Sequence, residues 1–242
     1  MSRVGDRARL EARVASKSFR TASGQSVHVL ADLSFALAEG ETGALIGPSG
    51  CGKSTLMRIL AGLDRDFEGF VRIPTHGRVG MVFQEPRLLP WRSVEDNVRL
   101  AAPDASEAEV AALFAALGLS DHRTHFPGEL SVGLARRTAL ARAFAVRPTL
   151  LLLDEPFVSL DAPLARQLQR DLARLVESRS MVTVLVTHDL DEAIALADRI
   201  FVLSARPAHV VGEIRITTPR AAISDEERKT IAGRIEALRD AP

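Results

Sequence analysis

The sequence has little cysteine and no long apolar run, and both shortages exclude classes of protein. Cys51 is the single cysteine among 242 residues, so no intrachain disulfide can form and a reducing compartment is expected. No run of about 18 apolar residues occurs, and the first residues lack the apolar core of a signal peptide. We therefore expect the chain to be soluble by itself, so that any role at a membrane needs a separate partner chain.

The chain also has no excess of charge of either sign. Its 31 lysine and arginine residues balance 31 aspartate and glutamate residues, which argues against a nucleic-acid-binding surface built on bulk charge. Hydrophobic residues at 46% are sufficient for a core, and charged residues at 26% argue against wholesale disorder. The length suits one large domain or a domain that carries an insertion.

Residues 47–54 read Gly-Pro-Ser-Gly-Cys-Gly-Lys-Ser, which fits the phosphate-binding pattern Gly-x-x-x-x-Gly-Lys-[Ser/Thr]. An apolar run at 42–46 suits a buried strand before it, and residues 55–63 have the leucine spacing of a helix after it. The glycines let the backbone curl its N–H groups around an anion, and the helix contributes the positive end of its dipole. A glycine-rich turn before an ordinary helix is the alternative, but the strand–loop–helix context favours a nucleotide site.

The predicted contacts to the triphosphate differ in their chemistry. Lys53 is expected to reach the β- and γ-phosphates, and the Ser54 hydroxyl is expected to ligate Mg²⁺. The loop residues predicted to bind the nucleotide are Gly47, Pro48, Ser49, Gly50, Cys51, Gly52, Lys53, Ser54 and Thr55. A catalytic role for the Cys51 thiol is not expected, because no base is placed to activate it.

A second part of the nucleotide site is predicted where four leucines at 150–153 precede Asp154 and Glu155. A buried strand points its last carboxylates at the carboxyl edge of the sheet, where ligands of α/β folds bind. Asp154 is expected to hold Mg²⁺ through water, and Glu155 to orient and deprotonate the attacking water. Two solvated acids at a strand end would give the same pattern, but the phosphate loop upstream favours the nucleotide site.

Apolar strands alternate with helices along most of the chain, which predicts a mostly parallel sheet covered on both faces. Strands are expected at 10–19, 26–37, 42–46, 78–83, 149–153, 182–186, 199–203 and 210–216. Helices are expected at 55–63, 131–146 and 164–177, and after capping boxes at Ser106-x-x-Glu109 and Ser224-x-x-Glu227. Residues 86–147 are helical and alanine-rich, so we predict an inserted helical subdomain within one domain of residues 1–242, whose core is 1–85 and 148–242.

The chain resembles the ATP-binding subunits of ABC transporters from about residue 10 to residue 216, in the order and spacing of that family's motifs. Gln84 follows its strand at the place of the glutamine that binds Mg²⁺ and senses the membrane partner. His188 matches the switch histidine that contacts the γ-phosphate, and Phe19 occupies the place of the aromatic residue that stacks on adenine. Singly, each of these matches is weak, and their fixed order is what makes the resemblance specific.

The signature motif and the D-loop extend the resemblance. Residues 130–133 read Leu-Ser-Val-Gly at the start of a helix, and residues 159–161 read Ser-Leu-Asp, which places Asp161 at the nucleotide site. The resemblance implies that Ser131 and Gly133 contact the γ-phosphate of ATP held by the opposite subunit.

The signature motif of the family usually reads Leu-Ser-Gly-Gly-Gln, and this chain departs from it at two positions. Val132 replaces the first glycine and Leu134 replaces the glutamine. The lost glutamine removes one polar contact, typically about 0.5–1.5 kcal/mol. We expect the site to work with a weaker ATP-bound dimer, and a degenerate half-site completed by a different subunit is the alternative.

Two further stretches, at 83–91 and 203–207, look like the ATPases of bacterial nitrate, sulfonate and taurine importers. In such importers the segment after the Q-loop, which is the loop that contains Gln84 in this chain, forms part of a groove for a coupling helix of the membrane subunit. Trp91 and Leu88–Leu89 would line this groove or lie beside it, although packing within the helical subdomain would explain them as well. The cargo rests on this analogy alone.

The resemblance implies an α/β fold of the P-loop NTPase (RecA-like) type, with a mostly parallel sheet core, an antiparallel β subdomain and the inserted α-helical subdomain. It also implies that ATP hydrolysis with Mg²⁺ powers a small-solute importer. Its expected partners are a second ATPase subunit, identical or paired, the membrane permease subunits and indirectly an extracytoplasmic solute-binding protein, with no nucleic acid. The chain would then lie peripherally on the cytoplasmic face of the inner membrane.

Two other readings remain open from the sequence. One is a soluble ABC ATPase that acts on a non-membrane partner, although the chain lacks the second cassette and the long insertions usual in such proteins. The other is a P-loop kinase for a small molecule, which would leave the signature helix and His188 unexplained.

Overall fold

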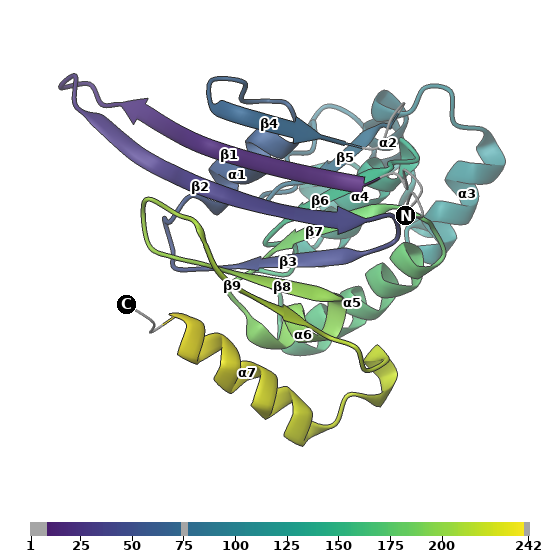
Figure 1. Ribbon diagram of the computed structural model, residues 1–242. Coiled ribbons are helices and arrows are strands. Elements are labelled where there is room, and N and C mark those ends of the chain that lie inside the picture. The colour runs from purple at the N-terminus through teal and green to yellow at the C-terminus, as the bar shows by residue number, and fades with distance from the viewer. Residues whose placement is uncertain (1–8, 74–76, 240–242) are drawn as a thin grey trace, which may run out of the picture. The chain divides into compact units, whose positions relative to one another are not determined.

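The computed structural model describes residues 9–73 and 77–239 (Figure 1). These residues form two compact units, one of which contains the described residues up to 73 together with those from 182 onward. The second contains the described residues from 77 to 181. The first eight residues, which carry the expectation about a signal peptide, lie outside the described part. Among the described residues, none of the helices combines the length and the apolar character that a membrane span requires.

An antiparallel sheet of three strands forms one layer of the first unit, as the expected antiparallel β subdomain requires. Its strands β1 (Arg9–Arg20), β2 (Ser26–Ala38) and β4 (Glu68–Arg72) pair in the order β2-β1-β4 (Figure 1). The sequence did not predict β4, because a glycine inside a short run weakens the strand signal. Gly69 is nevertheless required there, since a Cβ at this position would lie 2.0 Å from the Arg13 carbonyl oxygen of β1.

A second sheet of the first unit holds the strand that leads into the phosphate loop. Strand β3 (Thr42–Ile46) pairs in parallel with β7 (Val182–Val186) on one side and β8 (Arg199–Leu203) on the other. Strand β9 (Val210–Arg215) pairs antiparallel with β8 and extends this sheet. Every residue of β3 and β7 is buried, which explains why apolar runs alone predicted their bounds correctly.

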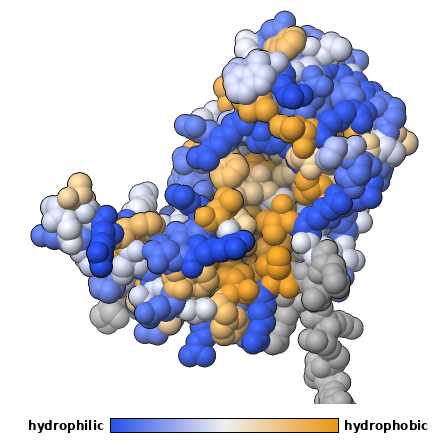
Figure 2. Space-filling model, turned by 90° about the horizontal axis from the view of Figure 1, so that it is seen from above, coloured by the Kyte–Doolittle hydropathy of each residue, from blue (hydrophilic) through white to orange (hydrophobic). Residues whose placement is uncertain are grey.

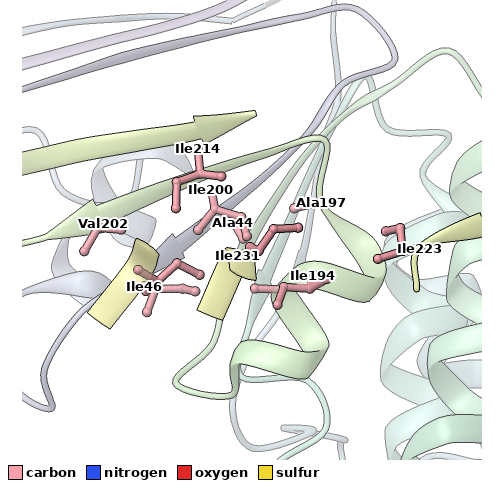
Figure 3. Packing of buried hydrophobic residues seen from close by; sticks show 11 residues of the cluster. Ala44, Ile46, Ile194, Ala197, Ile200, Val202, Ile214, Ile223 and Ile231 are labelled. Carbon is pink, nitrogen blue, oxygen red and sulfur yellow. The ribbon is translucent and has the colours of Figure 1, made fainter. Parts of the chain in front are cut away.

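Three helices complete the first unit: α1 (Lys53–Leu60), α6 (Leu190–Leu196) and α7 (Asp225–Arg239). Figure 3 shows side chains from β3, β8, β9, α6 and α7 packed in one buried cluster, including Ile46, Ile200 and Ile214. From α7, Ile231 and Ile235 are buried in this cluster, so the helix predicted after Ser224-x-x-Glu227 packs against the core of the first unit. Each isoleucine removed from water contributes about 1.5–3 kcal/mol to stability.

The second unit combines two parallel strands with four helices. Strands β5 (Val79–Val82) and β6 (Leu150–Asp154) pair in parallel. The helices are α2 (Val94–Ala101), α3 (Glu107–Ala116), α4 (Val132–Ala145) and α5 (Ala162–Glu177). Helix α3 begins with the predicted capping box, in which Ser106 and Glu109 satisfy each other's backbone N–H groups.

The helices α2, α3 and α4 lie inside the stretch 86–147 that was predicted to be a helical insertion. The compact unit that contains them also includes β5, β6 and α5, so the bounds of the insertion at 86 and 147 stay a prediction. Short 3₁₀ turns occur at Ser120–His122, Pro127–Glu129 and Arg220–Ala222. Helices α2 and α6 were not predicted individually, because both are too short to show a clear helical period.

Candidate functional site

The phosphate loop joins β3 to α1 and is shaped by glycines in left-handed conformations. Gly50 has φ = 75° and Gly52, the N-cap residue of α1, has φ = 131°. No side chain caps the first turn of α1, so its backbone N–H groups have no side-chain acceptor. Uncapped N–H groups at the start of a helix suit an anion such as a phosphate. The local geometry therefore fits the predicted nucleotide.

Close packing gives the loop glycines a second purpose. A Cβ at Gly52 would lie 2.8 Å from Leu30 Cδ2 and 2.9 Å from Val29 Cγ1 of β2. A Cβ at Gly47 would lie 2.9 Å from Leu203 Cβ, at the end of β8. The loop can approach both strands only because these positions carry no side chain.

The Lys53 ammonium group is held by the loop that it belongs to. Its side chain is buried, and Nζ donates hydrogen bonds to the carbonyl oxygens of Gly47 at 2.8 Å and Pro48 at 2.9 Å. Both acceptors are neutral, so the positive charge remains available to an anion. Ser54, the next residue of α1, is exposed.

Arg206 is a loop contact that the sequence did not reveal. Its guanidinium donates to the carbonyl oxygen of Gly50. The segment that carries Arg206 is itself attached to β2, because the Ala208 N–H donates to the Val29 carbonyl at 2.8 Å and the Ala31 N–H donates to the Ala208 carbonyl at 3.1 Å. Residues 203–207 were singled out only by their likeness to importer ATPases, and the structure shows that Arg206 within them is hydrogen-bonded to the phosphate loop.

Phe19, the predicted adenine platform, lies on β1 and is 42% exposed, so it is not a core residue. The ammonium group of Lys17 lies 4.6 Å from the centroid of its ring. Lys17 is itself buried and donates to the Asp64 carboxylate at 2.9 Å. The exposed ring is thus supported by a fixed cation, an arrangement worth about 0.5–2 kcal/mol.

His188 follows β7 in the first unit and is exposed. The next residue, Asp189, caps α6 by accepting hydrogen bonds from the N–H groups of Asp191 at 2.8 Å and Glu192 at 3.2 Å. This cap fixes the start of α6 directly after the histidine. The predicted switch residue therefore has a defined backbone position and an accessible imidazole.

In the second unit, the structure brings Gln84 to the same sheet edge as Asp154 and Glu155. Strands β5 and β6 are parallel, and Val82 is the register partner of Leu153. Both strands therefore end at the carboxyl edge of the sheet, and the predicted polar residues follow them there. Asp154 is buried, and Glu155 is in the left-handed region with φ = 46°. A non-glycine residue in this region is uncommon and often lies at a functional site.

Arg136 of α4 connects two of the predicted functional loops within the second unit. Its side chain is 5% exposed, and Nη1 donates to the carbonyl oxygens of Phe83, at 3.3 Å, and Gln84. The other terminal nitrogen, Nη2, donates to the Val158 carbonyl at 3.2 Å, just before the D-loop. Burial lowers the pKa of Arg136, and the nearby Glu85 carboxylate opposes this effect.

The residues at the signature motif and the D-loop also have structural partners. Ser131 caps α4 by accepting from the Leu134 N–H at 3.2 Å, and Asp161 caps α5 by accepting from the Leu164 N–H at 2.9 Å. A Cβ at Gly133 would lie 2.7 Å from Leu164 Cδ2, so glycine there has a packing reason as well. Val132, where the signature departs from the family pattern, is 56% exposed and has no packing role that demands valine.

Trp91 is 71% exposed, so the alternative that it packs inside the second unit is wrong. The turn that presents it is held by the buried Asn97, whose side chain accepts from the Leu89 N–H at 2.8 Å and donates to the carbonyls of Leu89, Arg92 and Ser93. Leu88 and Leu89 are partly buried. Figure 2 shows one face of the molecule, on which hydrophobic residues are exposed among hydrophilic ones.

Within the described residues, no group of three or more His, Cys, Asp and Glu side chains could hold a metal ion. The predicted ligands are instead Ser54, Gln84 and Asp154, which supply a hydroxyl, an amide and a carboxylate oxygen. Mg²⁺ is commonly held by one or two carboxylates together with water and substrate phosphates. The donor chemistry therefore fits Mg²⁺, and the ligand set stays a prediction.

Comparisons with known proteins agree with the motifs. The family model described as "ABC transporter" matches residues 30–158. An aliphatic sulfonates import ATP-binding protein of Pseudomonas syringae pv. tomato is 43% identical over 212 residues, which cover 86% of this chain and 89% of that protein. A protein of the same description from Xanthomonas axonopodis pv. citri is 44% identical over 224 residues, which cover 87% of each chain.

Solved structures show the same likeness. A dimeric ATP-binding cassette in a post-hydrolysis state, bound to ADP and Pi, has a TM-score of 0.74 and 27% identity, covering 87% of this chain and 100% of that one. A second dimeric structure, of a bacterial ABC transporter cassette, has a TM-score of 0.75 and 28% identity with the same coverage. These likenesses confirm the predicted P-loop NTPase fold.

Proposed function

This chain belongs to the ABC transporter family, and we propose that it is the ATP-binding and ATP-hydrolysing subunit of an importer for a small solute. The observation that carries the proposal is the phosphate loop at residues 47–54, with its left-handed glycines, its uncapped helix start and the Lys53 ammonium, which donates to the carbonyl oxygens of Gly47 and Pro48. These features together suit the triphosphate of ATP.

The cargo that we propose is a small organic sulfonate, a class that includes taurine, or another small oxyanion such as nitrate. Relatives that are 43–44% identical over most of the chain are described as import proteins for aliphatic sulfonates. The cargo would pass through the membrane subunits rather than contact this chain. An extracytoplasmic solute-binding protein would deliver it.

In the first unit, each predicted residue contributes to nucleotide binding. The loop N–H groups and Lys53 bind the phosphates, and the dipole of α1 adds favourable potential. Phe19 stacks on the adenine, with Lys17 on its ring. His188 contacts the γ-phosphate and steadies it as it leaves.

The residues of the second unit contribute the chemistry, and the order of the family's motifs assigns them to the same reaction. Glu155 orients the attacking water and accepts its proton. Ser54, Gln84 and Asp154 would hold Mg²⁺, which when bound neutralises phosphate charge. Ser131, Gly133 and Asp161 act on the ATP bound by an opposite subunit, so that the working form is a dimer.

The dimer couples ATP binding to transport through separate membrane permease subunits. ATP binds the closed dimer more tightly than the open one, so that binding closes it, and hydrolysis with product release reopens it. The Gln84 segment and the exposed Trp91 turn pass this motion to the permease. We place the chain peripherally, on the cytoplasmic face of the membrane.

The test of the assigned loop is the Lys53→Ala variant. ATP binding should weaken by about tenfold or more, because a charge-assisted contact is worth about 1.5–3 kcal/mol. Circular dichroism would confirm that the variant folds. A normal dissociation constant for ATP in a folded variant contradicts the assignment.

The two alternative readings are tested separately. Purified protein should release phosphate from ATP without any acceptor molecule, and failure to do so unless a small-molecule acceptor is added would favour a kinase. Gentle detergent extraction should copurify permease subunits. Copurification of a ribosome, DNA or a cluster-assembly complex instead would favour a non-membrane partner.

A further inference from the structure

The second unit contains a cavity that the proposed function does not use. Its volume is about 470 Å³, which is within the range of small-molecule pockets. It lies between α3, the C-terminal end of α4 and the C-terminal end of α5. The lining residues are Ala105, Glu109, Val110, Ala112, Leu113, Ala116, Phe144, Ala145, Arg147, Pro148, Leu175 and Arg179.

The walls of this cavity are mostly apolar. Val110, Leu113 and Phe144 are buried, whereas Ala112 and Ala116 are exposed. The two alanines are four residues apart on α3, so they lie on one face of the helix. Their small side chains leave the space between α3 and α5 open to a ligand.

One end of the cavity is positively charged. Arg147 and Arg179 both line it, while Glu109 is the single acidic residue of the lining. Glu109 pairs with Arg147 at 2.6 Å. Arg179 has no carboxylate partner among the residues that the structure describes: it donates to the Phe144 carbonyl at 3.1 Å and lies 5.1 Å from the centroid of that ring.

The charge of Arg179 is destabilised by its surroundings, which favours an anion beside it. Burial lowers the pKa of its guanidinium, and the positive charge of Arg147 lowers it further. An anion between the two arginines would relieve this repulsion and would form charge-assisted hydrogen bonds.

We propose that this cavity binds a small amphiphilic anion, with an aliphatic chain against α3 and a carboxylate or sulfonate head group at Arg147 and Arg179. Free phosphate could contact the two arginines, but it has no apolar part to fill the space along α3, so an anion with an aliphatic chain is favoured. The unpaired arginine disfavours an alkylammonium ion, because two like charges would then be brought together. This proposal does not depend on the proposed function, since every residue of the cavity lies outside the nucleotide motifs.

Saturation-transfer NMR and isothermal titration on the full chain provide the test. Hexanesulfonate and hexanoate are the probes, and we expect both to bind with a dissociation constant of about a millimolar or tighter. Hexyltrimethylammonium, which has the same chain and the opposite charge, and inorganic phosphate, which has no chain, should not saturate the protein. Equal binding of the alkylammonium ion, or no saturable binding of either anion, overturns the proposal.

Matched variants assign the binding to this cavity. Ala112→Trp fills the space on the exposed face of α3 and should weaken hexanesulfonate binding by about tenfold or more. Ala115→Trp adds the same side chain at an exposed position of α3 that does not line the cavity, and it should leave the affinity unchanged. If both tryptophan variants bind hexanesulfonate as the parent does, the site lies elsewhere and the proposal is wrong.

Substitutions of Arg179 test whether its positive charge binds the head group. Arg179→Gln should weaken binding by about tenfold or more, as expected for the loss of a charge-assisted hydrogen bond. Arg179→Lys keeps the charge and should retain most of the affinity. Since Arg179 also binds the Phe144 carbonyl, thermal unfolding must show that both variants fold, and equal affinity of the two folded variants contradicts the proposed head-group site.

Discussion

The phosphate loop of the first unit and the functional loops of the second unit are held in place by different means. The phosphate loop is shaped by backbone conformation and by missing side chains, as Gly50 and Gly52 show. In the second unit, the segment at Phe83 and Gln84 is instead linked to the segment before the D-loop by a buried side chain, Arg136, which donates to carbonyl oxygens in both. A loop that is shaped by glycines tolerates few substitutions. A loop that is held by hydrogen bonds from a neighbouring side chain tolerates many, provided that this side chain is kept.

This difference explains where the chain can depart from the family's pattern. Val132 lies in the signature motif, but its side chain is exposed and does not hold a loop in place. No comparable freedom exists at Gly47 or Gly52, because a Cβ at either position would contact a neighbouring strand at less than the normal distance. Substitutions in the phosphate loop of the first unit should therefore impair ATP binding, and substitutions in the functional loops of the second unit should impair turnover.

The largest separation of the two effects is expected from Glu155→Gln. The variant keeps the shape of the side chain and loses the proton acceptor, so turnover should fall by about 10²- to 10⁴-fold. ATP binding should remain nearly normal, as measured by titration with a non-hydrolysed analogue. Glu68→Gln, an exposed position on β4, is the matched control. Unchanged hydrolysis in Glu155→Gln would refute the role assigned to this residue.

Gly52→Ala should impair binding instead. The new Cβ would meet Leu30 and Val29, and φ = 131° is unfavourable for any residue with a side chain. Backbone strain of this kind costs about 1–3 kcal/mol before the steric contact is counted, so ATP affinity and thermal stability should both fall.

Gly50→Ala is the control within the same loop. Its φ of 75° is also left-handed, but a Cβ there has open space around it, so only the cost of that conformation, about 1–2 kcal/mol, is expected. Thermal unfolding and ATP titration of both variants test this order. Equal losses in the two would mean that close packing of the loop against β2 is not important.

Arg136→Gln tests the link made by Arg136 in the second unit. The shorter side chain cannot reach all three carbonyl oxygens, so buried acceptors lose their donor at a cost of about 1–3 kcal/mol in unfolding free energy. The midpoint of thermal unfolding should fall by about 2–4 °C for each kcal/mol. We also expect turnover at saturating ATP to fall more than ATP affinity does, because the Q-loop and the segment before the D-loop are no longer linked.

Arg142→Gln is the appropriate control for this prediction. Arg142 donates from the same helix to the carbonyls of Pro86, at 2.7 Å, and Arg87, at 2.8 Å, but it has no contact with Val158. It should lose similar stability and keep more of the turnover. A comparable loss of turnover in both variants would show that general stabilisation of the Q-loop segment, and not the link to Val158, is what matters.

The phosphate loop, the strand that ends in Asp154 and Glu155, and most strand bounds could be predicted from the sequence. Each of these features depends on residues that are close together in the chain. The runs at 42–46, 182–186 and 199–203 match β3, β7 and β8 residue for residue. Each is a short apolar stretch between polar turns, and burial on both faces leaves little ambiguity. Glycine spacing likewise needs no knowledge of the fold.

The hydrogen bonds that the arginine side chains donate to these loops could not be predicted, because their acceptors are backbone carbonyls far away in the sequence. Arg136 bonds to Gln84 and Val158, and Arg206 bonds to Gly50, yet a carbonyl oxygen has no residue identity to read. Strand β4 was missed for a related reason. Glycine normally disfavours a strand, and the need for it at position 69 arises from the nearby Arg13 carbonyl, which the sequence does not show. The roles of His188, Gln84, Ser131 and Asp161 stay predictions.

A modest gain in the stability of the ATP-bound dimer is expected when the family's glutamine is restored with Leu134→Gln. Leu134 is partly buried, and its backbone N–H already caps α4 through Ser131, so the exchange leaves the helix start intact. One added polar contact is worth about 0.5–1.5 kcal/mol, which corresponds to an increase of about two- to tenfold in the stability of the ATP-bound dimer. Analytical ultracentrifugation of Glu155→Gln and of the double variant with Leu134→Gln, both with ATP, measures the change. A weaker dimer in the double variant would show that this chain pairs by contacts of its own rather than by the usual signature, and would favour a different subunit as its partner.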